Sequence, residues 1–127
     1  MSDLTQESLV GTWRLIDMEV KWRTRPVHIY AEGTLVYTSQ GDVSVVMEIS
    51  RSRRCRLRKA VAYTGRYHVE GKETVHQLTN CTWPFNPKKQ LRRRAQILPD
   101  QRLRLVPVRK GNTVTCALTW KLADTRP

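Results

Sequence analysis

Several side chains in this sequence combine an apolar body with a polar tip, which suits contact with a small organic molecule. We predict that they converge on a shared interior and that Met47 adds a pliable apolar wall. Alternatively, the tyrosines only pack in the core, and the histidine lies on the surface or has its hydrogen bonds satisfied within the protein. The tryptophan would then only anchor a loop. The predicted contacts are Tyr37, Met47, Tyr63, Tyr67, His76 and Trp83.

Arginines supply the charged part of the predicted site. A guanidinium group binds a carboxylate or enolate through two parallel hydrogen bonds. Arg66 and the run Arg92-Arg93-Arg94 are the candidates, and Arg92 and Arg94 are included among the predicted ligand contacts. The run breaks the alternation of its strand, so the sequence leaves open which arginine faces inward. An inward arginine implies either an internal acid or an anionic group on a ligand, because an unpaired charge in a dry interior is costly.

The sequence leaves open whether the protein is an enzyme. We find no Ser-His-Asp arrangement in a recognisable context, no glycine-rich phosphate loop and no paired carboxylates on one strand. A small barrel can still isomerise or cyclise a substrate by shaping it and polarising one carbonyl group. In that case Tyr67, His76 and Arg92 would be the catalytic residues.

The cysteines predict neither a metal site nor a disulfide framework. Cys55, Cys81 and Cys116 are far apart, with no CxxC pair and no histidine at zinc-finger spacing. We therefore expect no metal and no cofactor. Three reduced thiols and a start that lacks the basic-then-apolar pattern of a secretory signal predict a cytoplasmic protein. No run of about 18 apolar residues is present, so no membrane span is expected.

The charge is large and uneven. The formal net charge is +12, and the bases lie mostly after residue 48. Such an excess suggests an anionic partner or a well-solvated surface. The arginine-rich stretch 51–59 would neutralise phosphates, so nucleic-acid binding is possible in principle. Exposed aromatics interleaved with bases are not evident, which makes this the weakest of the function hypotheses.

Short alternating runs separated by Gly, Pro, Asn and Asp position these residues and predict strands. Eight strands in meander order suffice to close an antiparallel up-and-down barrel with room for one small ligand. A short helical turn near Leu4 to Leu9 is expected to cap one end, and stretches 21–32 and 50–61 are expected to be irregular. The predicted strands are Gly11–Val20, Gly33–Thr38, Val43–Ile49, Ala62–Val69, Thr74–Cys81, Gln90–Leu98, Arg102–Val106 and Val114–Leu122.

The order of several motifs resembles the bacterial and fungal lipocalin-like domain family. The similar segments cover most of the chain and include LVGTWRL at 9–15, GTLVYT at 33–38, GDVSVVM at 41–47, AYTGRYHVEG at 62–71, TVHQ at 74–77 and LTW at 118–120. The resemblance implies an all-β barrel over residues 1–127 as one domain. Because some relatives are encoded with polyketide or terpenoid pathways, it also permits a cyclase or isomerase.

The pair Gly11-x-Trp13 resembles the signature of true lipocalins. The resemblance implies that the Trp13 indole plugs one end of the barrel and that Gly11 lets a neighbouring element approach. It also implies a basic side chain from the last strand over that ring, a cation–π contact for which Lys121 is the candidate. These three residues are therefore predicted to be structural.

Together these observations predict a small-molecule-binding barrel that holds an apolar or weakly acidic organic ligand. The first alternative is a cofactor-independent cyclase or isomerase acting on a polyketide- or terpenoid-type intermediate in the same cavity. The second is a basic barrel that binds nucleic acid. The expected assembly is a monomer or a homodimer.

Overall fold

The computed structural model describes residues 4–50, 59–82, 90–108 and 114–124. These residues form one short helix and nine strands. Their bounds are α1 Gln6–Leu9, β1 Gly11–Trp22, β2 Arg25–Val27, β3 Tyr30–Tyr37, β4 Asp42–Ser50, β5 Lys59–Glu70, β6 Glu73–Cys81, β7 Gln90–Leu98, β8 Arg102–Pro107 and β9 Val114–Asp124. Within the described ranges no helix has the length and apolarity needed to cross a bilayer.

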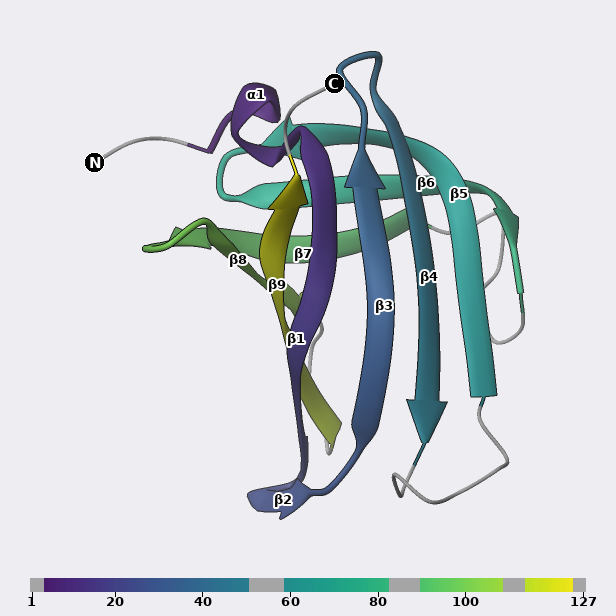
Figure 1. Ribbon diagram of the computed structural model, residues 1–127, viewed down its shortest axis with the longest axis vertical. Coiled ribbons are helices and arrows are strands. Elements are labelled where there is room, and N and C mark those ends of the chain that lie inside the picture. Colours follow the sequence, from purple (N-terminus) through teal and green to yellow (C-terminus); the bar gives the residue numbers. More distant parts are fainter. Residues whose placement is uncertain (1–3, 51–58, 83–89, 109–113, 125–127) are drawn as a thin grey trace.

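The strands form a closed antiparallel barrel (Figure 1). From β3 to β9 each strand pairs with the next one along the chain, and β1 pairs with both β3 and β9. The β1–β9 ladder runs from Thr12↔Asp124 to Trp22↔Val114 and completes the circle. This confirms the predicted eight-stranded up-and-down barrel. Closure matters for function because it encloses the inward side chains of all eight strands.

The ninth strand, β2, differs from the prediction of an irregular stretch at 21–32. It folds back on the end of β1 with Val20↔Val27 and Trp22↔Arg25 as partners. Its three residues are all exposed. Proline cannot donate to a strand ladder and is confined to strand edges or ends, so the sequence around Pro26 gives little strand signal.

Alternation along the strands places the predicted faces inside. Val43, Val45 and Met47 are buried on β4, whereas Val46 between them is 53% exposed. Tyr63 and Tyr67 are buried on β5. The period of two residues that defines a strand surface therefore also defines the barrel interior.

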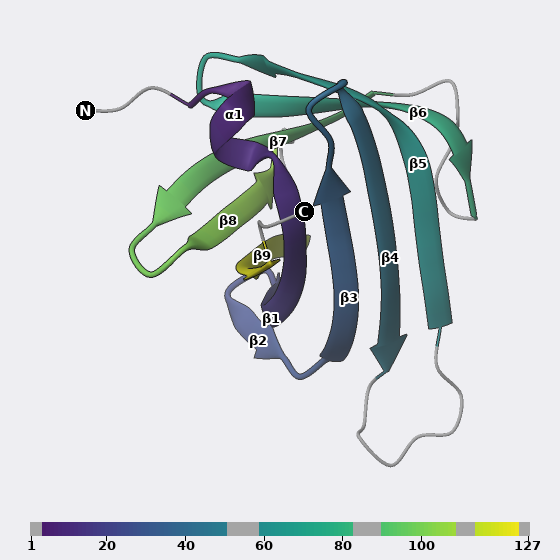
Figure 2. The same cartoon turned by 45° about the horizontal axis from the view of Figure 1, so that its top comes forward.

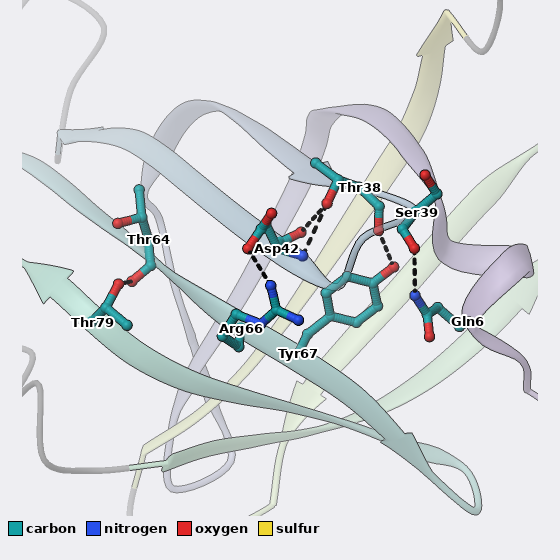
Figure 3. Close-up of polar contacts among 8 residues, drawn as sticks. All are labelled: Gln6, Thr38, Ser39, Asp42, Thr64, Arg66, Tyr67 and Thr79. Atoms are coloured by element: carbon teal, nitrogen blue, oxygen red, sulfur yellow. Dashed lines mark hydrogen bonds and ion pairs between the residues drawn. The ribbon is translucent and has the colours of Figure 1, made fainter.

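Helix α1 lies at one end of the barrel, beside the turn that joins β3 and β4 (Figures 1 and 2). Thr5 caps it, with its hydroxyl accepting from the Ser8 amide at 3.2 Å. Gln6 Nε2 donates to the Ser39 carbonyl at 3.1 Å, which ties the helix to that turn (Figure 3). Trp13 is buried and its indole donates to the Leu9 carbonyl at 2.8 Å. These contacts close this end of the barrel.

Candidate functional site

The inward faces of the barrel strands line a partly open cavity of about 290 Å³. Pockets that hold organic molecules measure about 300–1,000 Å³, so this cavity lies at the lower limit of that range and suits a small molecule. Most of its lining residues are aliphatic or thioether side chains or proline, and the others are polar, charged or aromatic. The lining consists of Met18, Leu35, Val45, Met47, Ile49, Lys59, Val61, Tyr63, His76, Arg93, Leu105, Pro107, Cys116, Leu118 and Trp120.

The lining comes from every barrel strand, one or more residues from each. On β4 the inward positions are Val45, Met47 and Ile49, and on β9 they are Cys116, Leu118 and Trp120. Both sets follow the period of two. Ile49, near the end of β4, pairs with Lys59, the first residue of β5. This pair lies at the end of the barrel opposite α1 (Figure 1). The cavity therefore extends away from the end that α1 closes.

A buried histidine between two tyrosines forms the polar part of the interior. His76 is 1% exposed. Its Nε2 lies 2.6 Å from the Tyr37 hydroxyl, and its Nδ1 lies 2.7 Å from the Tyr63 hydroxyl. A neutral imidazole donates at one nitrogen and accepts at the other, so one tyrosine donates to the ring and the other accepts from it. Both ring nitrogens are thus satisfied inside the protein.

Burial keeps this group of residues neutral. Burial, with a smaller contribution from the positive charge of Arg93, lowers the pKa of His76 to about 3. Burial also raises the pKa of Tyr63 to about 12 and that of Tyr37 well above its usual value. An effective general base or acid has a pKa near the working pH. The arrangement is therefore suited to holding hydrogen bonds and poorly suited to proton transfer near neutral pH.

The structure brings three of the predicted ligand contacts to the cavity: Met47, Tyr63 and His76. Tyr37 and Tyr67 are buried but do not border it. Their rings pack together with centroids 4.6 Å apart, and the Tyr67 hydroxyl donates to the Thr38 carbonyl at 2.7 Å (Figure 3). These two tyrosines therefore support the closed end of the barrel. Trp83 lies outside the described residues, as does stretch 51–58 of the predicted phosphate-binding segment.

The alternation along β7 decides which arginine of the run faces inward. Arg92 and Arg94 are exposed on the outer face and do not line the cavity. Arg93 lies between them, is half-buried and borders the cavity. Successive side chains of a strand point to opposite faces, so Leu91 and Ala95 share the inward face with Arg93 and fix the phase. The sequence left the choice among the three arginines open, and the structure places Arg93, which is not among the predicted ligand contacts, at the cavity.

Lys121 also differs from its predicted role. Its ammonium group donates to the Asp100 carbonyl in the β7–β8 turn instead of lying over the Trp13 ring. The β1–β9 register explains this, because Lys121 pairs with Arg14, and it is Leu122 that pairs with Trp13. Gly11 has a φ of 144°, a conformation open to glycine, where the chain leaves α1 for β1.

Three polar residues at the cavity are absent from the predicted contacts: Lys59, Arg93 and Trp120. The alternation of β9 places Trp120 on its inward stripe, which is the signal that could have identified it. Lys59 falls in a stretch expected to be irregular, although it begins β5. Counting back by twos from the inward Tyr63 would have placed Lys59 inside.

Comparison with known proteins assigns the chain neither to a family nor to a function. No family model matches the chain, and no curated protein matches it. The eight-stranded barrel is therefore an observation, while membership of the lipocalin-like family stays a prediction. Among the described residues, no three His, Cys, Asp or Glu side chains gather as a metal site would require.

A second, shallow hollow of about 320 Å³ lies against β3–β6, apart from the cavity. Its lining includes Asp42, Arg66, Thr64 and Thr79 (Figure 3). The Arg66 guanidinium already binds Asp42 at 2.9 Å, and the Thr79 hydroxyl donates to the Thr64 carbonyl at 3.1 Å. Because these groups already bind one another, this hollow is a weaker candidate for a ligand site than the cavity.

Tyr37→Phe tests the histidine network. It removes the partner of a fully buried ring nitrogen, and an unsatisfied buried polar group costs about 1–3 kcal/mol. We therefore expect the free energy of unfolding in urea to fall by about 2 kcal/mol, with an unchanged m-value. A loss below about 0.5 kcal/mol would mean that the bond between Tyr37 and His76 is not made in solution.

Proposed function

We propose that the protein binds a small, largely apolar organic molecule inside the barrel. The single observation that carries this proposal is the cavity of about 290 Å³ within a closed barrel. Protein interiors are close-packed, and voids larger than a water molecule are few. A hollow of this size in so small a barrel is therefore best explained as a place for a ligand.

The lining supports the same conclusion. Apolar side chains such as Leu35, Val61 and Leu105 make up most of the wall, and a few polar groups are confined to defined positions. Ligand sites have this composition: the apolar area supplies affinity, and the polar groups fix orientation. The neutral His76 and Tyr63, bonded to each other, add polar surface to the wall without the cost of a buried charge.

The isomerase alternative has weaker support. Of its three predicted catalytic residues, Tyr67 hydrogen-bonds to Thr38 away from the cavity and Arg92 is exposed on the outer face. His76 borders the cavity, but its pKa of about 3 makes it a weak base. Binding without turnover is the function that the geometry supports best.

Filling the cavity tests the proposal. Val45 borders the cavity and its neighbour Val46 is exposed on the outer face. Val45→Phe should weaken binding of the neutral fluorescent probe phenylnaphthylamine at least about tenfold, a difference of about 1.4 kcal/mol. Val46→Phe makes the same chemical change on the outside and should leave binding unchanged. The fluorescence rise on titrating the probe measures both.

Stability provides the second readout. A larger residue forced into a packed core costs about 1–3 kcal/mol, whereas one that fills an existing void costs less. The free energy of unfolding of Val45→Phe should therefore lie within about 1 kcal/mol of the wild-type value. Leu118→Trp, which fills the cavity from β9, should also block the probe. If the wild type does not bind the probe, or if both filled variants bind it as the wild type does, the proposal is wrong.

A further inference from the structure

Two outward arginines of this barrel are paired with carboxylates, and the inward one is not. Arg92 binds Glu70 at 2.7 Å and Glu73 at 3.3 Å, and Arg66 binds Asp42 at 2.9 Å. Arg93 makes one long hydrogen bond of 3.4 Å to the Arg92 carbonyl. Within the described ranges, no carboxylate lies at ion-pair distance from Arg93. Because Arg93 is half-buried at the cavity, it would gain more from an anionic partner than an exposed arginine would.

Arg93 brings a positive charge to the cavity wall. Among the described residues, no Asp or Glu borders the cavity. A half-buried charge is screened less than a surface charge, so it acts on groups across the cavity. The Arg93 charge opposes the rise in the pKa of Tyr63 and adds to the fall in the pKa of His76. The cavity therefore favours a negative charge.

A neutral hydrogen-bond donor lies in the same wall. Trp120 is 1% exposed and borders the cavity. Its indole Nε1 is buried and has no acceptor among the residues that the structure describes. Most buried polar groups have a partner, and each exception needs an explanation. An acceptor brought by a ligand would satisfy this group.

We infer that the ligand carries a carboxylate, held by the Arg93 guanidinium and the Trp120 indole N–H, with its apolar body among the aliphatic side chains of the cavity. This inference rests on the proposed function and adds the chemical class of the ligand. A carboxylate has the planar two-oxygen geometry that a guanidinium fork matches. It also supplies the acceptor that Trp120 lacks.

Two probes of equal shape and different charge test the inference. Naphthoate and naphthamide share the same ring system and differ in a carboxylate and a neutral amide. Isothermal titration of the wild type should show naphthoate binding at least about tenfold more tightly. Arg93→Gln should remove this preference and leave the affinity for naphthamide within about threefold of its wild-type value.

Arg94→Gln is the matched control, because it removes one charge from the adjacent outward position. It should keep the preference for naphthoate. Trp120→Phe keeps an aromatic ring and removes the indole N–H, so it should weaken naphthoate binding about threefold and naphthamide binding less.

The outcomes separate the two proposals. If the wild type binds both probes equally, the cavity binds ligands but the carboxylate inference is wrong. If Arg93→Gln and Arg94→Gln weaken naphthoate equally, attraction to the overall charge explains the preference and the inference is also wrong. If neither probe binds the wild type, the proposed function fails together with the inference.

Discussion

Gly65→Ala should lower the free energy of unfolding by more than about 3 kcal/mol, beyond the usual cost of an overpacked core. A Cβ atom at this position would lie 2.0 Å from the Gln77 carbonyl oxygen and 3.0 Å from the Leu78 Cα. Both are backbone atoms of β6, so no side-chain rotation relieves the clash. The β5–β6 register shifts between Thr64 and Gly65, and the two backbones come together there. The strands must separate to admit one methyl group.

Gly71→Ala is the control for this prediction. Gly71 lies in the β5–β6 turn at a φ of 60°, and a Cβ atom added there would meet nothing within 4 Å. Its replacement costs only the strain of the left-handed backbone, about 1 kcal/mol. Urea unfolding followed by circular dichroism measures both variants. Equal losses would show that the close approach at Gly65 does not exist in solution.

Acid should destabilise the barrel through His76. In the folded protein its pKa is about 3, and in the unfolded chain the ordinary value is 6.5. Below pH 6.5 the unfolded state binds more protons than the folded state, so stability falls as the pH falls. The stabilisation is complete above pH 6.5 and is lost progressively toward pH 3. At about 1.4 kcal/mol per pKa unit, the free energy of unfolding lost once the pH lies below both pKa values is about 5 kcal/mol.

His76→Gln isolates this contribution. An amide can donate to one tyrosine and accept from the other, and it does not titrate in this range. The variant should be less stable than the wild type at about pH 7, yet its free energy of unfolding should fall much less between about pH 7 and about pH 4. Chemical denaturation at several pH values measures the two slopes. Parallel slopes would mean that His76 is not buried in its neutral form.

Much of the fold followed from the sequence because strand periodicity is local. The alternation through Val43, Val45 and Met47 identifies both a strand and its inward face without any knowledge of the rest of the chain. Tight turns with glycine and aspartate, such as Ser39 to Asp42, then fix the order of neighbouring strands. An eight-strand meander with these faces has few ways to bury them other than closing into a barrel.

The site was harder to predict because it depends on registers between distant strands. Tyr37 and Tyr63 reach the same imidazole from β3 and β5, and no spacing in the sequence specifies that meeting. The phase of β7 depended on Leu91 and Ala95, two weak signals beside three arginines. Lys121 illustrates the same difficulty, since one step of β1–β9 register decides which residue lies beside Trp13.

A titration followed by methyl NMR tests the central claim most directly, using naphthamide because it does not depend on Arg93. If the barrel is hollow, intermolecular nuclear Overhauser effects should connect the naphthalene ring to methyl groups of the lining residues Val45, Val61, Leu105 and Leu118. The methyl groups of Val46, which is exposed on the outer face, should show none. Contacts confined to these outer methyl groups, or no contacts at millimolar probe, would contradict a ligand site inside the barrel.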